Sequence, residues 1–451
     1  MSRPFEQRAH RALSMVARDQ EQAHLSAAFD HARNEQATVV LVSGEPGIGK
    51  TRLIQEFLKS HQDDATIIEA VCYSDIVHPL AAMQSALQRI SEFSAPGWDE
   101  ALGQAQLSSF IRSRGDSGTN ADSAEDVRRT IDRITVLLQT LAESQPVIVS
   151  MDDAQWASEP DLELVRYLLR SPRDTPILVI LGYRDTDIDP RGALQQLIRD
   201  AYRESTVERI ALKRIGEHGA RQLIGAILDS AAHTIARPLA QAIQQEAEGV
   251  PFFIEELVLH LHESGSLRRE GKTWMIANKA EIDIPQSIHG VVTSRLMALS
   301  EEAQKTLSIG AVYGRTFPLD LIVDVAQRIE SSSPEEVAAQ LDEALSRSLI
   351  VENHAGPDVR AQISYAFAHD QIREVLTRDL NAIRRRILHQ AIAEALEEHG
   401  NPAEPGYDAA LAYHFGNGED IARASQFAER AGDQDARLGA FFQASTHYST
   451  A

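Results

Sequence analysis

Short apolar runs alternate with amphipathic stretches along the first half of the chain. The runs are rich in Val, Ile and Leu and span only a few residues, which is typical of buried strands. The stretches between them repeat apolar residues every three or four positions, as helices do. Strands that alternate with helices form a parallel sheet with helices on both faces. We therefore predict a three-layer α/β domain over residues 1–215, with five parallel strands at 38–42, 66–71, 147–151, 177–181 and 207–212.

The pattern becomes mainly helical after residue 215. Residues 217–262 repeat apolar positions at helical spacing, with one break at Gly249-Val250-Pro251. Glycine commonly ends a helix and proline commonly starts one, so this break predicts a rigid hinge between two helices. We interpret residues 216–284 as a helical lid that carries this Gly-x-Pro module.

Residues 285–380 combine short helices with a hairpin. The hairpin strands are expected at 349–352 and 362–367, and Gly356-Pro357 marks the loop between them. Helices that are followed by a two-stranded wing predict a winged-helix domain. Winged helices often bind DNA, but this region has no recognition helix rich in arginine or lysine.

Residues 381–451 are alanine-rich and helical, with aromatic residues at helical spacing. Such helices, joined by glycine-containing turns, predict an all-α region of TPR-like repeats. Only about one and a half units are present, and a repeat stack normally ends in a polar cap. The last helix, expected at 439–451, has no such cap. We therefore expect the chain to be a fragment or a truncated product of a longer helical array.

The glycine-rich segment after the first strand carries the clearest chemistry. It reads Gly-x-x-x-x-Gly-Lys-Thr and leads into a helical stretch at 50–60, which is the context of a P-loop rather than of an ordinary glycine turn. Backbone N–H groups and the helix N-terminus then surround the phosphates of ATP or ADP. Lys50 is expected to reach the β- and γ-phosphates, and the Thr51 hydroxyl to bind Mg²⁺. The residues expected to contact the nucleotide are Gly44, Glu45, Pro46, Gly47, Ile48, Gly49, Lys50, Thr51 and Arg52.

A P-loop ATPase also needs acids at the end of a neighbouring strand. Asp152 and Asp153 end the strand at 147–151. Asp152 is expected to hold Mg²⁺ through water, and Asp153 to orient or activate the attacking water. The alternative is a polar strand-to-helix turn, where Asp is common. Arg184 follows the strand at 177–181, at the sheet edge where ligands bind, and is either a γ-phosphate sensor or a surface arginine.

The composition narrows the functional classes. The chain has 66 acidic and 44 basic residues, which gives a formal net charge of −22. Proteins that bind nucleic acids usually need a basic face, so direct nucleic-acid binding by this segment is disfavoured. The run Arg384-Arg385-Arg386 is accordingly interpreted as a solvated helix face rather than a phosphate-binding stripe.

The location of the protein follows from what the sequence lacks. Cys72 is the only cysteine, so an internal disulfide is excluded. No apolar run approaches the ~20 residues that cross a membrane, and the first residues have no apolar segment typical of a secretory signal. We expect a cytoplasmic protein without a membrane partner.

Several further segments stand in a fixed order around the P-loop. They are Ala17-Arg18-Asp19 with Leu25 in place of a Gly-Arg-Glu box, Asp152-Asp153-Ala154-Gln155-Trp156-Ala157, Tyr183-Arg184, Gly249-Val250-Pro251-Phe252-Phe253 with Glu255-Glu256, Arg295-Leu296, Gly314-Arg315-x-Phe317, and Phe367-Ala368-His369-Asp370-Gln371-Ile372-Arg373. In this order the motifs resemble the STAND ATPases, AAA+-like P-loop proteins that act as signal-transducing switches. The subgroup is the one found in large LuxR-type regulators and in the ATPase half of soluble-type adenylyl cyclases.

The resemblance implies that Arg18 and Pro251 also bind the nucleotide. It also implies that His369 and Asp370 correspond to the His-Asp pair by which related immune-receptor ATPases hold ADP in a closed state. A neutral imidazole such as that of His369 can hydrogen-bond to the β-phosphate of ADP. The alternative is a helix-capping His-Asp pair outside the site.

The resemblance further implies a conformational switch rather than a metabolic enzyme. ADP holds the winged helix against the ATPase core, and exchange for ATP opens the chain and allows self-association. A protein or small-molecule inducer that binds the helical repeats biases this exchange. Slow ATP hydrolysis resets the switch, and Asp153 in place of the more usual Glu is compatible with slow turnover.

Three other functions stay open at this point. The chain is either the ATPase module of a multidomain adenylyl cyclase, a DNA-binding regulator that uses the winged helix, or a scaffold that does not depend on ATP. The sequence that flanks this segment would distinguish the first two functions. A cyclase domain upstream would indicate cyclic-nucleotide synthesis, and a helix-turn-helix downstream would indicate transcription. The scaffold predicts that Lys50→Ala leaves function intact.

Overall fold

The computed structural model of the chain describes most of its residues: 15–34, 37–72, 79–91, 96–112, 124–169, 175–190, 192–201, 207–276, 288–347, 349–353, 363–400, 402, 406–437 and 441–450. The chain forms two compact units. The first, which we call the sheet unit, comprises Gln20–Glu45, Lys50–Leu212 and Leu396–Ala451. The second, the lid unit, comprises Met1–Asp19, Pro46–Gly49 and Lys213–Ala395.

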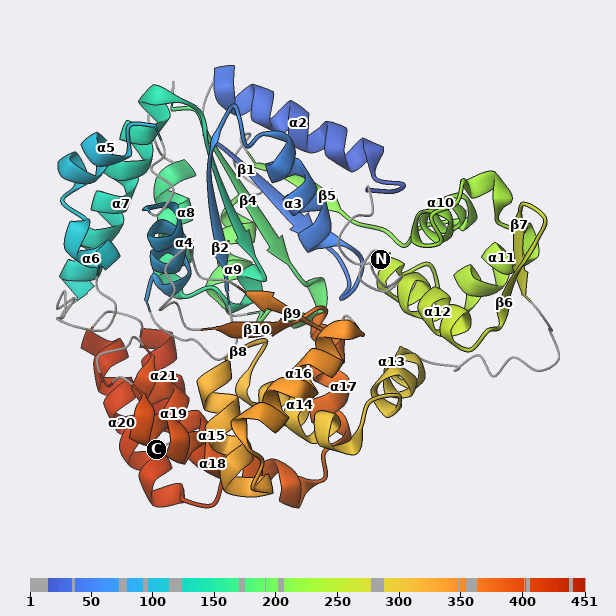
Figure 1. Cartoon of the computed structure of the whole chain (residues 1–451). Coiled ribbons are helices and arrows are strands. Elements are labelled where there is room, and N and C mark those ends of the chain that lie inside the picture. The colour runs from blue at the N-terminus through green and yellow to red at the C-terminus, as the bar shows by residue number, and fades with distance from the viewer. Residues whose placement is uncertain are drawn as a thin grey trace. The chain divides into compact units, whose positions relative to one another are not determined.

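A five-stranded parallel sheet forms the centre of the sheet unit (Figure 1). Its spatial order is β2-β3-β4-β1-β5, so the strand before the P-loop lies beside the fourth and fifth strands of the chain. The strands are β1 Thr38–Ser43, β2 Thr66–Val71, β3 Val147–Asp152, β4 Ile177–Tyr183 and β5 Val207–Ala211. All five predicted strands are thereby confirmed, and the fold is an α/β P-loop sheet followed by a helical region.

Helices cover both faces of this sheet. Figure 1 shows α2 and α3 over one face and α4, α7 and α8 over the other. The rings of Phe29 and Phe57 meet edge to face at 6.2 Å between centroids and pack α2 on α3. The helices of this part are α2 Asp19–Asn34, α3 Lys50–Ser60, α4 Ala81–Ser91, α5 Trp98–Ala105, α6 Ser108–Arg112, α7 Ala124–Ser144, α8 Glu159–Leu169 and α9 Ala193–Ala201, with single 3-10 turns η1 Ala154–Trp156 and η2 Asp185–Asp187.

The strands are apolar on both faces because both faces are covered. Val39 and Leu41 of β1 belong to the core cluster that also holds residues of α4, α7 and α8. Val40 and Val42 alternate with them, lie outside that cluster and are equally buried. A parallel sheet with two covered faces gives such continuous runs of Val, Ile and Leu, which is why the sequence pattern identified these strands.

A buried capping box follows the acidic end of β3. The Ser158 hydroxyl donates to Asp161 Oδ2 at 2.5 Å and accepts the Asp161 N–H at 3.3 Å, so it caps α8. The same hydroxyl accepts the Leu80 N–H at 3.2 Å, and Asp161 Oδ1 accepts the Met83 N–H at 3.4 Å. The box therefore caps the N-termini of α8 and α4 together and fixes both helices beside β3.

We predict that Asp161 makes the stability of the protein depend on pH. Burial raises the pKa of Asp161 from its ordinary 3.8 to about 6. As the pH rises from about 4 to 6, the unfolded chain loses this proton before the folded one does. The free energy of unfolding should therefore fall by roughly 3 kcal/mol across this window, for this group alone. Urea unfolding at pH 4 and pH 7 measures it.

The matched comparison is between Asp161→Asn and Asp132→Asn, because Asp132 is exposed on α7 of the same unit. We expect Asp161→Asn to remove most of that fall, and Asp132→Asn to leave it as in the wild type. Equal pH slopes for the two variants would contradict the assignment.

The lid unit begins with three helices around their own core. They are α10 Glu217–Ile227, α11 Arg237–Glu246 and α12 Pro251–Glu263, with a 3-10 turn η3 Ala232–Thr234. The helices predicted for 217–262 and the turn at Gly249-Val250-Pro251 are confirmed, since Val250 is the N-cap of α12 and Pro251 its first residue. The hinge motion assigned to this turn stays a prediction.

A hairpin follows α12 that the sequence pattern did not predict. It pairs β6 Leu267–Glu270 with β7 Thr273–Ile276. Three of the four β6 residues are charged and exposed, so β6 lacks the apolar alternation by which strands are identified. The helical lid predicted for residues 216–284 therefore also contains a hairpin.

The described residues of 288–379 in the lid unit form helices α13 to α17 and a small antiparallel sheet of order β8-β10-β9. The predicted hairpin is confirmed as β9 and β10, and the predicted loop residues 354–360 lie outside the described residues. The winged-helix interpretation stays a prediction. The elements are α13 Ile288–Met297, α14 Glu301–Tyr313, β8 Thr316–Pro318, α15 Leu319–Glu330, α16 Pro334–Ser346, β9 Ile350–Asn353, β10 Ser364–Phe367 and α17 Asp370–Asp379.

A buried ion pair joins two helices of the lid unit. Arg295 of α13 donates through Nη1 to both carboxylate oxygens of Glu256 in α12, at 2.5 and 2.6 Å. Its Nη2 donates to the backbone carbonyl of Arg347, the residue that caps the C-terminus of α16. The two paired side chains are only 2% and 1% exposed. Arg295 therefore ties α12, α13 and α16 together without access to water.

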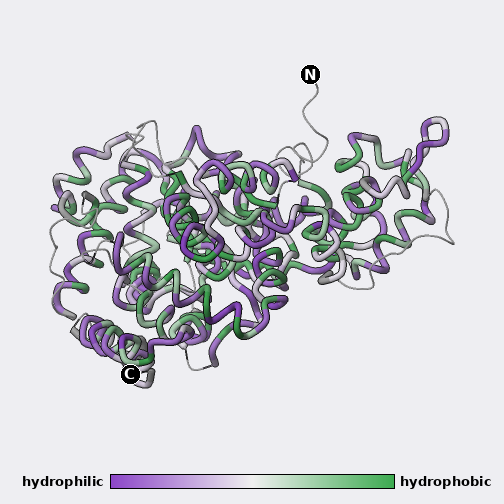
Figure 2. Tube along the Cα trace, turned by 60° about the horizontal axis from the view of Figure 1, so that its bottom comes forward, coloured by the Kyte–Doolittle hydropathy of each residue, from purple (hydrophilic) through white to green (hydrophobic). Residues whose placement is uncertain are grey.

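The last part of the chain is helical, as predicted. The helices are α18 Ala382–His399, α19 Tyr407–Asn417, α20 Ile421–Arg437 and α21 Phe441–Thr450. Helix α20 packs against both α19 and α21, and the rings of Phe415 and Phe427 stack at 5.9 Å. In Figure 2 hydrophobic and hydrophilic positions alternate along the helices, which is the amphipathic pattern from which they were predicted. That these helices are TPR-like repeats stays a prediction.

Among the residues that the structure describes, no helix combines the length and the apolar composition that crossing a membrane requires.

Candidate nucleotide-binding site

The P-loop residues belong to both units. Gly44, Glu45, Lys50 and Thr51 are part of the sheet unit, whereas Pro46–Gly49 is part of the lid unit.

Lys50 is the first residue of α3 and is buried. Its ammonium group donates to the carbonyl oxygens of Gly44 at 2.8 Å and Glu45 at 3.1 Å. Burial lowers the pKa of Lys50, and the charges of Asp152 and Asp153 oppose this effect. A desolvated ammonium that is held only by two carbonyls gains much from an anionic partner, so the position suits a phosphate.

Thr51 and Asp152 meet at the end of β3. The Thr51 hydroxyl donates to Asp152 Oδ2 at 2.6 Å, and the Asp153 N–H donates to Asp152 Oδ1 at 3.0 Å. A Cβ at Gly182 would lie 2.7 Å from Asp152 Oδ1, so a glycine in β4 lets this carboxylate lie against the neighbouring strand. The structure thus brings together two residues that are separated by 101 positions and that were both predicted as metal ligands.

The ligand set fits Mg²⁺ rather than a metal held by protein alone. Mg²⁺ prefers oxygen ligands, keeps several waters and usually takes one or two protein groups together with substrate phosphates. A hydroxyl and a carboxylate in contact meet that requirement. Among the described residues, no group of three or more His, Cys, Asp or Glu side chains is arranged to hold a metal ion.

Asp153 and Arg184 also lie together in the sheet unit. Arg184 Nε is 3.6 Å from Asp153 Oδ1, and its Nη1 is 3.5 Å from Asp187 Oδ2. Arg184 is buried, so it is not an ordinary surface arginine. Between the two, Gln155 donates to Asp153 Oδ1 at 2.9 Å and accepts the Arg184 N–H at 3.0 Å.

In the lid unit, the tip of the P-loop packs against the start of α12. The Phe252 N–H donates to the Gly47 carbonyl at 3.2 Å. Gly47 has a φ of 74°, in the left-handed region, and a Cβ there would lie 3.0 Å from Phe252 Cβ. Glycine is therefore needed at this position for its backbone angle and for its close contact with Phe252.

His369 lies against the side chain of Phe252. Its ring is tilted against the Phe252 ring at 4.4 Å between centroids. His369 is the N-cap residue of α17, but its side chain makes no capping hydrogen bond. Asp370 instead pairs with Arg373 at 3.0 Å. The structure thus groups Gly47, the Pro251-Phe252 start of α12 and His369 within one unit.

Arg18 ties the P-loop tip to the chain that enters the lid helices. Its Nη2 donates to the Ile48 carbonyl at 3.2 Å and to the Lys213 carbonyl at 2.7 Å. Ala17 before it has a φ of 55°, where glycine sits without steric cost. The backbone at Ala17 therefore has the conformation that the glycine of a Gly-Arg-Glu box would favour. Arg52, the last predicted contact, lies half-buried in the first turn of α3.

Two residues of this site were not singled out from the sequence. Phe252 and Gln155 were named only as members of family motifs, and neither was given a role in the site. Both act by contacts with residues far along the chain. No local sequence signal predicts such contacts. Only the observation that β3 and β4 are neighbours in the sheet indicates that Gln155, after β3, lies near Arg184, after β4.

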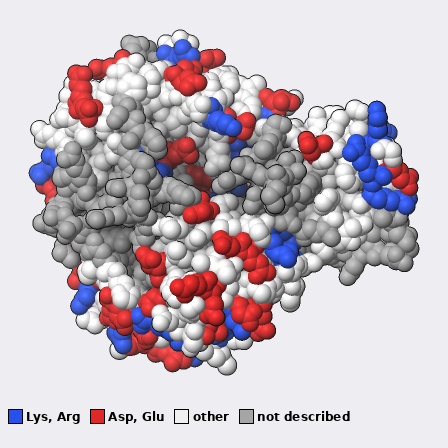
Figure 3. Space-filling model, viewed as in Figure 1, with Lys and Arg blue, Asp and Glu red and all other residues white. Residues whose placement is uncertain are grey.

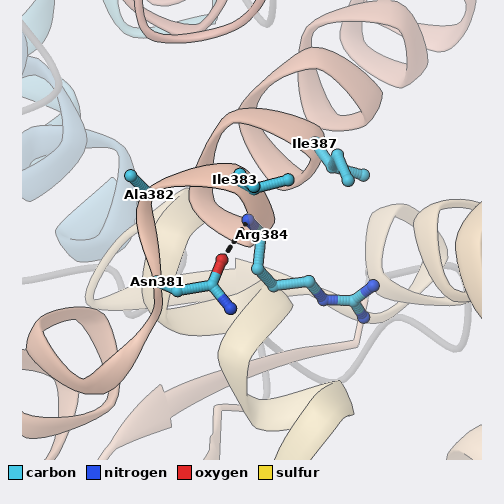
Figure 4. Close-up of a pocket in the computed structure, with 5 residues that line it drawn as sticks. All are labelled: Asn381, Ala382, Ile383, Arg384 and Ile387. Atoms are coloured by element: carbon cyan, nitrogen blue, oxygen red, sulfur yellow. Dashed lines mark hydrogen bonds between the residues drawn. The ribbon is translucent and has the colours of Figure 1, made fainter.

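A separate pocket of about 460 Å³ lies at the start of α18 (Figure 4). The Asn381 side chain accepts the Arg384 N–H at 2.8 Å and so caps the helix. Arg384 pairs with Glu330, which leaves Ile383 and Ile387 as the apolar lining. None of the pocket's lining residues is a carboxylate, histidine or thiol, so it offers no acid–base chemistry.

Charge is unevenly placed on the face shown in Figure 3. Lys and Arg gather over the β6–β7 hairpin, where Arg268, Arg269 and Lys272 are exposed. Arg268 is paired with Glu270 at 2.6 Å. Arg384 and Arg385, predicted to lie on a solvated helix face, are instead half-buried, and Arg385 Nη2 donates to the Thr377 carbonyl at 2.6 Å.

Residues 14–180 match the family model of the AAA ATPase domain. The matched part contains the P-loop, Asp152 and Asp153, and it reaches into β4. This part of the chain is therefore an AAA-type ATPase domain.

The chain is also similar to an uncharacterized protein of Rhizobium meliloti (strain 1021), with 23% identity over 421 residues. The alignment covers 89% of this chain and 39% of that protein, so the chain spans well under half the length of this relative.

Two solved structures are similar to the chain at 14% identity. A Walker-type ATPase of Pyrococcus abyssi has a TM-score of 0.37 and is matched over 80% of this chain and 96% of its own. The ORC1 protein of Aeropyrum pernix, solved in complex with DNA, has a TM-score of 0.35, over 81% and 93%. At these TM-scores neither structure adds to the description of the fold.

Proposed function

We propose that the protein is a regulatory ATPase, a switch that binds Mg²⁺ with ATP or ADP and hydrolyses ATP slowly. ATP binding and self-association would pass a signal to an output domain or partner, in transcription or in cyclic-nucleotide signalling. The observation that carries the ATPase part is the 2.6 Å contact between Thr51 and Asp152, beside the buried Lys50. A P-loop ATPase uses a hydroxyl, an aspartate and a lysine of this kind to hold Mg²⁺ and the β- and γ-phosphates, which supports the proposal.

Hydrolysis requires that water attack the γ-phosphorus while the bond to the β-phosphate oxygen breaks. Asp153 is proposed to orient this water and accept its proton, and Lys50 with the bound Mg²⁺ to stabilise the charge on the leaving ADP. Mg²⁺ would be held by Thr51 directly and by Asp152 through water. Arg184, held between Asp153 and Asp187, is proposed to contact the γ-phosphate.

The switch part rests on the lid-unit contacts. Phe252 touches the P-loop tip at Gly47 through its backbone and touches His369 through its ring. If the P-loop tip shifts when ATP replaces ADP, these contacts would transmit the shift to α12 and to the start of α17. A nucleotide shifts the equilibrium between a closed and an open state only if it binds the two states with different affinity. Such a switch therefore needs contacts that differ between the ADP and ATP states.

Asp153→Asn tests the hydrolysis step. Asp153 has a φ of 53°, and Asn adopts this left-handed backbone as readily as Asp, so the fold should be retained. We expect the rate of phosphate release to fall by about 10²–10³-fold, because the amide cannot accept the proton of water. Binding of a fluorescent ATP analogue should change by less than about threefold.

Asp132→Asn on the exposed face of α7 is the matched control and should hydrolyse ATP like the wild type. Full activity of Asp153→Asn would remove Asp153 from the mechanism. A wild-type protein that binds no ATP would overturn the proposed function as a whole.

A further inference from the structure

We propose that Gln155 is a positioning residue. Its side chain holds Asp153, the carboxylate proposed to accept the proton of water, in place against Arg184 at the end of β4. This inference rests on the proposed ATPase function and assigns a role within that same site. The Gln155 side chain hydrogen-bonds to Asp153 and to the Arg184 N–H, rather than to the P-loop or to the predicted magnesium ligands. Its effect on the reaction would be transmitted through Asp153.

The chemistry of the two partners fixes the orientation of the Gln155 amide. A backbone N–H can only donate, so the atom that faces Arg184 N at 3.0 Å must be the carbonyl oxygen Oε1. A carboxylate accepts, so the atom that faces Asp153 Oδ1 at 2.9 Å must be the donor Nε2. Only a side chain with both a donor and an acceptor at this reach serves both contacts.

The Asp153 backbone adopts an unfavourable conformation that additional contacts can stabilise. Asp153 has φ 53° and ψ 41°, an αL conformation that non-glycine residues adopt at some cost, and the 3-10 turn η1 follows at once. The Trp156 N–H donates to the Asp153 carbonyl at 2.9 Å, which closes the turn on its backbone side. Gln155 holds the carboxylate side of the same turn.

The second hydrogen bond of Gln155 reaches the end of a different strand. Arg184 is the residue directly after β4, and β4 pairs with β3 in parallel register up to Met151–Leu181. The Gln155 bond to the Arg184 N–H continues that pairing past the last strand residues by means of a side chain. Displacement of the β4 end would therefore move the Asp153 carboxylate, and the guanidinium 3.6 Å from it, as one group.

Three variants separate the two hydrogen bonds from simple packing. Gln155→Met keeps the length of the side chain and removes both bonds. Gln155→Glu keeps the acceptor for the Arg184 N–H but replaces the donor with a second carboxylate oxygen beside Asp153. Gln196→Met is the matched control, because Gln196 is exposed on α9 of the same unit.

We expect both Gln155 variants to lower kcat for ATP hydrolysis by about 10–100-fold, since a small displacement of a reacting group has effects of that size. The dissociation constant for a fluorescent ATP analogue should stay within about threefold of the wild type. The melting temperature should stay within about 3 °C, because the lost bonds are half-exposed and few. Gln196→Met should match the wild type in all three.

The outcomes distinguish the two levels of the proposal. If the wild type hydrolyses ATP and Gln155→Met does so at an equal rate, the positioning role is wrong and the proposed function stands. Equal losses of ATP binding, melting temperature and kcat would also overturn the positioning role, because they would indicate general damage to the fold. A wild type that binds but does not hydrolyse ATP would overturn both.

Discussion

Lys50→Ala should raise the dissociation constant for Mg²⁺-ATP by roughly 10²-fold or more, and no hydrolysis should be measurable. The Lys50 ammonium is buried and is held by the carbonyls of Gly44 and Glu45 at 2.8 and 3.1 Å. Phosphate oxygens carry negative charge, so they bind this ammonium more strongly than the carbonyls do. Alanine removes the only cation that the P-loop motif directs at the phosphates. Isothermal titration calorimetry with the full chain measures the effect.

Lys59→Ala is the control, because Lys59 is exposed in the last turn of the same helix. It should bind ATP like the wild type. Burial lowers the pKa of Lys50, which means that its charge is poorly solvated in the folded protein. We therefore expect Lys50→Ala to keep the melting temperature of the nucleotide-free protein, so that loss of binding cannot be mistaken for unfolding. Nucleotide affinity within about threefold of the wild type would contradict the assignment.

Arg295→Met should destabilise the lid unit by about 3–5 kcal/mol. The substitution leaves the Glu256 carboxylate 1% exposed and without its cation, and it also removes the bond to the Arg347 carbonyl. A buried charge without a partner costs much more than the ion pair contributes. Urea denaturation, followed by hydrogen exchange of peptides from α12 and α13, measures the loss where it arises.

The double variant Glu256→Met with Arg295→Met separates the two effects. It removes both charges and fills the space with apolar atoms, so we expect it to recover most of the stability that the single variant loses. Arg268→Met is the control, because the Arg268–Glu270 pair is about half exposed and should contribute less than about 1 kcal/mol. A double variant as unstable as Arg295→Met would show that the shape of Arg295, rather than its charge, is what the helices require.

Much of the sheet unit was predictable because its signals are local. The five strands are apolar throughout, since both faces are covered, and helix α3 has the predicted bounds. The P-loop and Asp152 were predicted as partners in metal binding from motif context alone, and the structure places Thr51 and Asp152 in contact. Parallel strands have their carboxyl ends at one edge, so residues that follow β1 and β3 come together without further information.

The rest depended on contacts that a single sequence does not contain. The β6–β7 hairpin was missed because β6 is mostly charged, and β8 because it is only three residues long. The contact of His369 with Phe252 joins residues 117 positions apart on helices that have no common motif. The buried partner of Glu256 could likewise not be found from the charge pattern, because a charged residue on a helix is usually exposed.

The central proposal is that nucleotide identity controls the assembly state of the protein. Multi-angle light scattering after size exclusion, with saturating Mg²⁺-ADP or a non-hydrolysable Mg²⁺-ATP analogue, tests it most directly on the full chain. The proposal predicts a monomeric mass with ADP, a multiple of that mass with the ATP analogue, and no change for Lys50→Ala in either nucleotide. An identical mass in both nucleotides, when calorimetry confirms that both are bound, would contradict it.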